Sequence, residues 1–337
     1  MSDWELSDES HQEILRRDIL PLYFPRAVSS DDPTLVLLIG QPGAGRSRPT
    51  GQLIAEHGAD LAALNANDLR AFHPRLLELA DARSPEASAV LSRATAEWVR
   101  GCVRFARENH RSLLLEGTFQ DPSVAMATAA RFATKGFGTR VVVVASRRAE
   151  SLMSVVSQYL REVHAGAPAQ YTSLAAHDRG FTGTHSLVAV AEESAPVDRL
   201  TVLGRDGQAV FDAQRAGAMD AFAGASAALS IAQSARLGRF GATQWLSELH
   251  HVTDFATSRS DLPRGVTQSL VELHAIAIDE VIPELLVPAG GTFATVMEQK
   301  VSARLASLRR SLQPEDSMYT STPIMVPGGP GQTGPSR

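Results

Sequence analysis

The sequence predicts a three-layer α/β fold, in which helices cover both faces of a mostly parallel sheet. In the first half of the chain, apolar stretches of strand length alternate repeatedly with amphipathic helical stretches, and a glycine-rich loop follows the first strand. A hairpin pattern then gives way to a long Ala- and Leu-rich region of helical periodicity. We therefore expect an α/β domain over residues 1–212, a helical extension over 213–312 and a disordered tail over 313–337.

Composition limits the class of protein. The 337 residues carry a formal net charge of -5, which argues against sequence-independent binding to nucleic acid. The single cysteine, Cys102, excludes an internal disulfide and a Cys-rich metal site, and we expect it to be a small apolar residue in a helix. The N-terminus is acidic and polar, and no stretch approaches the ~20 apolar residues of a membrane span. We expect a cytoplasmic protein with no membrane partner.

The first strand and the loop after it carry the clearest functional signal. The strand Leu35–Ile39 runs into the loop Gly40, Gln41, Pro42, Gly43, Ala44, Gly45, Arg46 and Ser47. The pattern to compare is G-x-x-x-x-G-K-[ST], in which backbone N–H groups surround phosphates, Lys reaches the β- and γ-phosphates and the hydroxyl holds Mg²⁺. We expect all eight residues to bind a nucleotide, with Ser47 as a metal ligand. The alternative is a tight strand-to-helix turn that binds nothing.

Arg46 stands where this pattern has lysine. It keeps the positive charge, but a broad planar guanidinium replaces a compact ammonium, and the two groups are not interchangeable at such a site.

The remaining elements follow in order. An amphipathic helix over 7–22 has Ser7 for capping, and Pro21 and Pro25 are expected to end it. The helix after the loop is expected to begin at Gly45 or Arg46. Later elements are expected as strands over 62–65, 112–115 and 140–145, helices over 84–109, 124–134 and 150–165, a loop over 166–172, a helix with His177 and Asp178, and a hairpin turning at 205–207. Breaks in the helical extension are expected at 261–264 and 288–292.

Polar side chains follow the second and third strands. Asp68 comes just after the strand 62–65, and Glu116 and Thr118 follow the strand 112–115. In doubly wound sheets the carboxyl ends of the strands form the ligand-binding edge. Asp68 is therefore a candidate base for a hydroxyl or a Mg²⁺ ligand, and Glu116 and Thr118 are candidate contacts to substrate or Mg²⁺. The alternatives are helix caps at Asp68 and Thr118. His73 is expected to be structural.

These features together resemble the zeta toxin family, the toxin kinases of bacterial toxin–antitoxin systems. The resemblance runs from about Ser7 to Asp212 and has several parts in order. They are PTLVLLIGQPGAG, Asn67-Asp68 with Phe72-His73-Pro74, LLLEGT, VVVVAS, the Gly166/Tyr171-Thr172 loop, His177-Asp178 and RLTVLGRDGQAVFD.

The resemblance implies a P-loop kinase fold that uses Mg²⁺ with ATP or GTP to phosphorylate the 3′-hydroxyl of the sugar of UDP-N-acetylglucosamine. It also implies a small helical antitoxin as a partner, whose N-terminal helix covers the nucleotide site. In such enzymes the aspartate matching Asp68 takes the hydroxyl proton, and the serine matching Ser47 holds Mg²⁺. The residues matching Glu116 and Thr118 face the sugar, and the lysine at the position of Arg46 stabilises the transferring phosphoryl group with two arginines.

The chain departs from the family at several of these positions. The two arginines align with Gln158 and Gln170, and an acidic residue of the long helix aligns with Arg100. Loss of one arginine of this kind can cost up to about 10⁵-fold in rate. Arg48, Arg147, Arg148 and Arg161 are nearby replacements, and Arg161 lies one helical step from Gln158, so we include it among the substrate-binding candidates.

Three functions are therefore open from the sequence. The first is an active kinase of the zeta type, since Asp68, Ser47, Glu116 and Thr118 are retained. The second is a catalytically degenerate protein that binds nucleotide or antitoxin, since the replacements fall together at phosphate-facing positions. The third is a P-loop kinase with another small-molecule substrate, because a fold does not fix a substrate.

Overall fold

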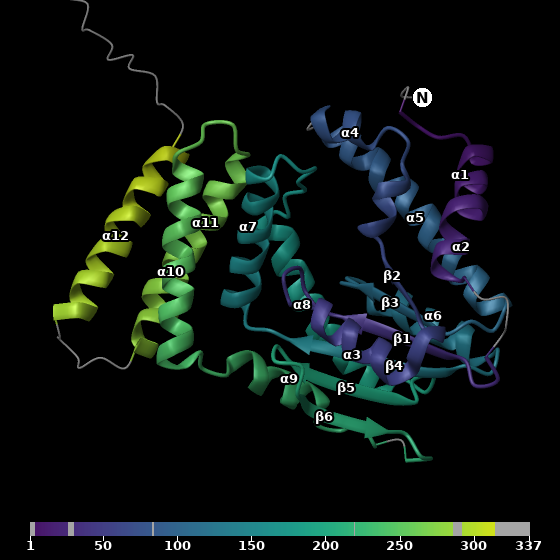
Figure 1. Cartoon of the computed structure of the whole chain (residues 1–337). Coiled ribbons are helices and arrows are strands. Elements are labelled where there is room, and N and C mark those ends of the chain that lie inside the picture. The colour runs from purple at the N-terminus through teal and green to yellow at the C-terminus, as the bar shows by residue number, and fades with distance from the viewer. Residues whose placement is uncertain (1–3, 26–29, 83, 219, 286–291, 314–337) are drawn as a thin grey trace, which may run out of the picture.

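The computed structural model describes residues 4–25, 30–82, 84–218, 220–285 and 292–313. It confirms the predicted α/β class: six strands form one sheet in the order β2-β3-β1-β4-β5-β6, with helices on both sides (Figure 1). Five strands are parallel, namely β1 (Thr34–Ile39), β2 (Ala62–Asn65), β3 (Leu113–Gly117), β4 (Gly138–Ala145) and β5 (Arg199–Gly204), and β6 (Ala209–Gln214) is antiparallel. Apart from residue 313, the expected disordered tail lies outside the described residues.

The apolar run of β1 is buried on both faces of the sheet. Leu35, Leu37 and Ile39 join the larger core, whereas Val36 and Leu38 join a smaller core on the opposite face. This division follows from the period of two along a strand, which sends neighbouring side chains to opposite faces. The strand ends at Ile39 in the middle of the sheet, between β3 and β4, and Gly40 follows it.

Helices between residues 8 and 234 cover the larger core. They are α1 (Asp8–Ile14), α2 (Leu20–Tyr23), α5 (Pro85–Glu108), α6 (Pro122–Ala133), α8 (Leu174–Glu193) and α9 (Ala225–Ser234). Cys102 is fully buried in α5, as predicted. The helix α3 (Ser47–His57) packs Leu53 into the smaller core on the other face. The short helix η2 (Gly58–Asp60) joins α3 to β2, and the short helix η3 (Asp68–Phe72) and the helix α4 (Leu76–Ala82) lie between β2 and α5 in the chain.

The N-terminal helix passes Pro21, so the prediction that this proline ends it is wrong. A π-helical turn, η1 (Leu15–Ile19), joins α1 to α2, and the Leu20 N–H bonds to the Leu15 carbonyl five residues back. Pro21 falls in the first turn of α2, where a missing N–H costs least. Ser7 caps α1 as predicted, accepting from the Ser10 N–H at 3.2 Å.

The helical extension forms a separate core together with α7 (Arg148–His164). Its helices are α10 (Gly238–Thr257), α11 (Arg264–Ile276) and α12 (Thr292–Leu312), with the short η4 (Ala277–Val281) and η5 (Ile282–Leu285) before α12. Leu152, Val156 and Leu160 of α7 pack against α10 and α11 in this core. Figure 1 shows these helices on one side of the sheet, opposite α1, α2 and α5. The expected break at 288–292 lies almost wholly outside the described residues.

The expected division of the chain at residue 212 stays a prediction. Among the helices within the described ranges, none has both the length and the apolar character that crossing a membrane requires.

Candidate active site

The glycine-rich loop leaves β1 at the middle of the sheet and enters α3 at Ser47, one or two residues later than predicted. Gly43 and Gly45 adopt φ angles of +78° and +88°, which side chains rarely tolerate. A Cβ atom on Gly43 would lie 2.1 Å from the carbonyl oxygen of Ser151 in α7. The loop therefore approaches α7 so closely that only glycine fits, and this contact fixes the path of its backbone.

Arg46 is turned back onto the loop. Its Nη1 donates to the Gly40 carbonyl oxygen at 2.5 Å, and its Nε lies 3.7 Å from Oε2 of Glu116. The side chain is 20% exposed. Burial lowers the pKa of Arg46, and the nearby Glu116 carboxylate acts in the opposite direction. The guanidinium is thus held at the mouth of the loop by one carbonyl and one carboxylate.

Glu116 is the centre of a small hydrogen-bond network at the end of β3. The Thr50 hydroxyl donates to its Oε1 at 2.5 Å, and the Asn65 amide donates to its Oε2 at 3.1 Å. With Arg46, these residues form what we call the front network. Thr50 was missed by the sequence reasoning, although its place one turn into the helix after Ser47 puts it on the side of the helix that faces the loop. Ser47 itself is exposed at the start of α3.

Asp68 is exposed as the first residue of η3, just after β2. The alternative role of a helix cap is not observed, because the capping position is Asn67, which makes no capping bond with its side chain. Asn65 instead orders this turn by accepting from the Asn67 N–H at 2.9 Å. Burial, and after it the Asp68 carboxylate, raises the pKa of Tyr23 to about 12.

Thr118 is half-buried just after β3. It does not cap the following helix, because Asp121 occupies that position and accepts from the Ser123 N–H at 2.9 Å. The next residue, Phe119, has a positive φ of 41°, and its ring lies against Gly117, where a Cβ atom would be 2.8 Å from a ring carbon. This bend leaves Thr118 at the same sheet edge as Glu116.

Arg147 and Arg148 are already paired with acidic residues of the extension. Arg147 donates to Glu284 at 2.7 Å, and Arg148 donates to Glu272 at 2.6 Å. Arg148 also makes two hydrogen bonds of 2.9 Å to Asp178, and hydrogen bonding to this carboxylate raises the pKa of Arg148. Neither arginine can replace a missing catalytic cation without breaking these pairs. Arg48 and Arg161 are exposed, and their part in the site stays a prediction.

The two glutamines that replace family arginines make local contacts. Gln158 donates to Glu162 one turn further along α7, at 2.9 Å. Gln170 accepts from the guanidinium of Arg70, which belongs to η3. Arg70 thus brings a positive charge next to one of the positions where the family arginine is missing, and the sequence reasoning did not single it out.

A second cation that sequence reasoning missed is Arg205, in the predicted hairpin turn between β5 and β6. Its Nη1 lies 3.5 Å from the Gly43 carbonyl oxygen and donates to the Ser146 hydroxyl at 3.1 Å, and its Nη2 donates to Ser154 at 2.8 Å. The residue was interpreted only as part of a turn, because its distance from the glycine-rich loop in the sequence hides their contact in space.

A buried hydrogen-bond chain lies behind the loop, and we call it the rear network. Gln41 donates to the Ser146 carbonyl at 2.7 Å and to the Ser151 hydroxyl at 3.3 Å. Ser151 lies 2.9 Å from Nε2 of His177, and Nδ1 of His177 lies 3.0 Å from Asp178, which binds Arg148. Burial lowers the pKa of His177 despite the neighbouring Asp178 carboxylate, so the neutral imidazole is favoured.

A pocket of about 470 Å³ opens beside the segment that carries Asp68, and we call it the η3–α5 pocket. It is lined by Ala66, Asn67, Arg70, Ser92, Thr95, Ala96, Val99, Arg100 and Gln170. Its size falls within the range of small-molecule sites. Over the described ranges, no cluster of three or more His, Cys, Asp or Glu residues suited to a metal ion is present.

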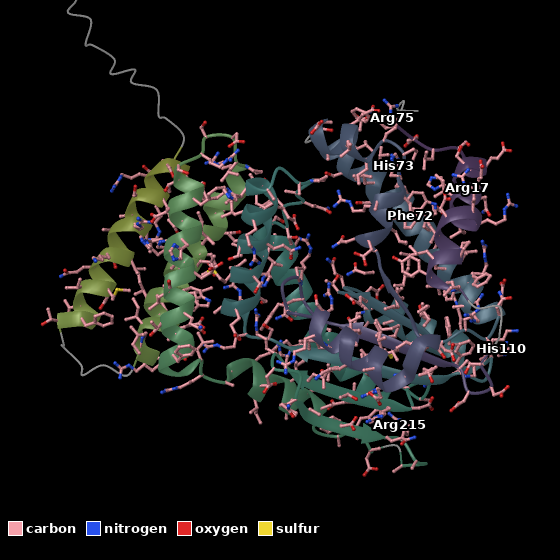
Figure 2. The ribbon with its side chains drawn as sticks, viewed as in Figure 1. Arg17, Phe72, His73, Arg75, His110 and Arg215 are labelled. Atoms are coloured by element: carbon pink, nitrogen blue, oxygen red, sulfur yellow. The ribbon has the colours of Figure 1, made fainter. Side chains whose placement is uncertain are left out.

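His73 has the structural role that we expected. It is buried, and its ring lies 6.4 Å from that of Trp98 in α5. Figure 2 shows His73 and Phe72 in the segment that leads toward α4, well away from the sheet. Burial lowers the pKa of His73.

A parallel sheet with a glycine-rich loop between its central strand and a helix, and with acidic residues at the ends of the neighbouring strands, defines a P-loop kinase-like protein. The chain belongs to the zeta toxin family, a family of kinase-like toxins, whose sequence model matches residues 24–216. The resemblance stated from the sequence is therefore confirmed.

The relatives match part of the chain at low identity. Toxin PezT of Streptococcus pneumoniae serotype 4 is 24% identical over 212 residues, which are 62% of this chain and 83% of PezT. Toxin zeta of Enterococcus hirae is 23% identical over 150 residues, and these span 44% of this chain and only 52% of that toxin. A solved structure from the PezAT chromosomal toxin–antitoxin system of Streptococcus pneumoniae has the same fold, with a TM-score of 0.64, 21% identity, and coverage of 74% of this chain and 98% of that one.

Proposed function

We propose that this protein transfers the γ-phosphoryl group of ATP or GTP to a sugar hydroxyl of UDP-N-acetylglucosamine. The main support is that the carboxyl ends of three neighbouring parallel strands lie at the same level in the sheet. Asn65 of β2 pairs with Glu116 of β3, and Gly117 pairs with Ile39 of β1, so the glycine-rich loop, Glu116 and the segment bearing Asp68 start from one edge of the sheet. Phosphoryl transfer depends mainly on positioning and charge stabilisation, which such an edge can supply.

In the proposed reaction, the acceptor hydroxyl oxygen bonds to the γ-phosphorus and the bond from that phosphorus to the leaving nucleoside diphosphate breaks. The hydroxyl proton passes to the carboxylate of Asp68, which is exposed and follows the neighbouring strand. The products are a nucleoside diphosphate and a phosphorylated sugar. Glu116 and Thr118 would position the acceptor, with Arg161 as a further contact from α7.

The donor set at the loop fits Mg²⁺ held together with a nucleotide. Ser47 offers an exposed hydroxyl at the start of α3, and no acidic cluster of the described residues provides an all-protein cage. Mg²⁺ normally takes few protein ligands and completes its shell with phosphate oxygens and water. When bound, it would neutralise phosphate charge. The backbone N–H groups of Gly40–Ser47 would surround the phosphates, and Arg46 would have to leave the Gly40 carbonyl to reach them.

The test is mass spectrometry of the protein incubated with Mg²⁺, ATP and UDP-N-acetylglucosamine, beside the variant Asp68→Asn. We expect a product heavier by one phosphate with the native chain and none with the variant, while both bind ATP with nearly equal affinity. Among the described residues, no hydrogen bond or ion pair joins Asp68 to the glycine-rich loop, so we expect the substitution to leave ATP affinity nearly unchanged. Unchanged turnover in the variant would remove Asp68 as the base, and absence of any transfer by the native chain would overturn the proposed function.

A second candidate function is a degenerate member that binds nucleotide or antitoxin without catalysis. The position of Arg46 favours it, because the guanidinium is held by the Gly40 carbonyl and Glu116 instead of standing free. ATP binding without transfer to any acceptor would support this candidate.

Membership of the family also supports a small helical antitoxin as the partner, with one of its helices over the nucleotide site. Because the proposed substrates are nucleotides, the proposed place of action is the cytoplasm.

A further inference from the structure

The η3–α5 pocket has lining residues of only one charge sign. Arg70 and Arg100 contribute to its wall, and none of the residues described as lining it is acidic. Its other lining residues are uncharged, with Ala96 and Val99 on the α5 side and the polar Asn67 and Gln170 elsewhere. Asn67 and Arg70 flank Asp68 in the sequence, although Asp68 itself does not line the pocket. A ligand in this pocket would therefore meet two guanidinium groups and no carboxylate from the lining residues.

Arg70 is half-buried, and its hydrogen-bond acceptor in this structure is the neutral amide of Gln170. Burial lowers the pKa of Arg70, and Glu162 is the carboxylate that opposes this effect from a distance. A partly desolvated guanidinium gains most from an ionised acceptor, because charge-assisted hydrogen bonds are stronger than those to neutral groups. Arg70 is thus placed to exchange the Gln170 amide for an anion.

Arg100 is also available to a ligand. Its partner is Glu97, one turn earlier in α5, and the two side chains are 64% and 55% exposed. Exposed pairs of this kind contribute little, so replacing Glu97 by a ligand would cost little. With Arg70, it offers planar donor groups that match carboxylate and phosphate oxygens.

We propose that the η3–α5 pocket selects acceptors whose reacting part carries a carboxylate or a phosphate, bound by Arg70 and Arg100. This inference rests on the proposed phosphotransferase activity and changes its preferred acceptor, because the reacting sugar of UDP-N-acetylglucosamine carries neither of these groups. The two arginines offset the repulsion between such an anion and the Asp68 carboxylate. The transferred phosphoryl group still forms its bond to a hydroxyl oxygen of the acceptor, and the proton of that hydroxyl still passes to Asp68.

Matched pairs of ligands test the proposal by calorimetry without ATP. UDP-glucuronate differs from UDP-glucose by a carboxylate, and glucose 6-phosphate differs from glucose by a phosphate. We expect the acid-bearing member of at least one pair to bind about 10- to 100-fold more tightly, as one or two charge-assisted hydrogen bonds would give. Arg70→Met and Arg100→Met should each remove most of this preference. The control Arg104→Met, one turn along α5 at an exposed position outside the pocket, should keep it.

The outcomes distinguish which acidic group of the ligand the pocket binds. A preference confined to the first pair identifies a carboxylate, and one confined to the second pair identifies a phosphate. Equal affinities within both pairs, or no measurable binding of the acid-bearing members, overturn the proposal. Loss of UDP binding itself in the arginine variants overturns it as well, because the arginines would then bind the diphosphate. The binding assay contains no ATP, so its result does not depend on phosphoryl transfer. Transfer to UDP-N-acetylglucosamine without any preference for acid-bearing ligands would overturn this inference but not the proposed function. Absence of transfer would overturn the proposed function but not the binding preference.

Discussion

The front and rear of the glycine-rich loop differ in burial and in how their polar groups are paired. In the front network Arg46 is 20% exposed and lies 3.7 Å from Glu116. In the rear network Gln41, Ser151 and His177 are fully buried and joined by hydrogen bonds of 2.7 to 3.3 Å. Buried polar groups are costly when unpaired, so the rear groups hold one arrangement, whereas the front groups can exchange partners with water or a ligand.

This difference indicates a division of labour within a short loop. The rear side, together with the contact between Gly43 and Ser151, fixes the backbone path, and the front side presents groups that a phosphate can recruit. Changes behind the loop should therefore lower the free energy of unfolding more than changes at the front do, and changes at the front should also alter binding and turnover.

The largest effect on stability is expected for Arg147→Met, just behind the loop. Arg147 and Glu284 form an ion pair in which the side chains are 10% and 8% exposed. Removing one partner of a buried pair leaves the other charge uncompensated, and we expect the free energy of unfolding to fall by about 3–5 kcal/mol. Denaturant titration measures this change. Arg17→Met is the control, because Arg17 lies on the outside of the N-terminal helix (Figure 2) and is 66% exposed. Equal midpoints for the two variants would contradict the comparison.

A smaller loss of stability is expected for Glu116→Gln in the front network. The amide keeps one acceptor for Thr50 but loses the charge that faces Arg46, and we expect the free energy of unfolding to fall by about 1–3 kcal/mol. Because Arg46 is released, binding of Mg²⁺-ATP should tighten by up to about fivefold, while transfer becomes slower. Calorimetry with ATP and a turnover assay check both parts. Weaker ATP binding in the variant would show that Glu116 does not restrain Arg46.

A pH-dependent loss of stability is expected from His177 in the rear network. Burial lowers the pKa of His177 below its ordinary value of 6.5, so the unfolded chain takes up a proton first as the pH falls. Its contribution to stability is complete above pH 6.5 and is lost below it, until the folded protein is protonated too. His73 and His274 are shifted in the same direction. Denaturant titrations between pH 7.5 and 5.5 should show a slope that His177→Gln reduces by about one proton. An unchanged slope would exclude His177.

The smallest effect on stability is expected for Arg46→Lys. The substitution removes the hydrogen bond to the Gly40 carbonyl at a partly exposed site, so the unfolding midpoint should stay close to that of the native chain. If the proposed function holds, turnover should rise by about tenfold, because a compact ammonium no longer bonds to the loop and can reach the phosphates. A fall in turnover would instead show that the site is adapted to arginine.

Local patterns were sufficient to predict the sheet and most of its helices. The hydrophobic periodicity and the glycine positions correctly predicted the strand at Leu35–Ile39, the strand 62–65 and the turn at 205–207. The exception at Pro21 arises because a π-helical turn ends just before it, so that Pro21 falls in the first turn of α2, where a missing N–H costs least, and the sequence carries no signal for such a turn. Short helices such as α4 were not predicted, because a few residues show no clear period.

The site was only partly predictable, because its partners are distant in sequence. The rule that the carboxyl ends of parallel strands form one edge of a sheet correctly placed Glu116 close to the glycine-rich loop. The roles assigned to Asp68, Ser47 and Thr118 stay predictions. The contact of Arg205 with the loop and the pairing of Arg70 with Gln170 depend on tertiary packing across 162 and 100 residues, respectively. Likewise, local sequence patterns could not predict that Arg147 and Arg148 pair with Glu284 and Glu272 of the extension.

The shared core of α7 and the extension bears on how this chain can have changed over evolution. The family match ends at residue 216, yet Leu152, Val156 and Leu160 of α7 are buried against helices that begin after it. Loss of the extension would leave an apolar stripe facing water beside the glycine-rich loop. A change that removed these helices would therefore have to be accompanied by substitutions along α7 that replace its apolar stripe with polar residues.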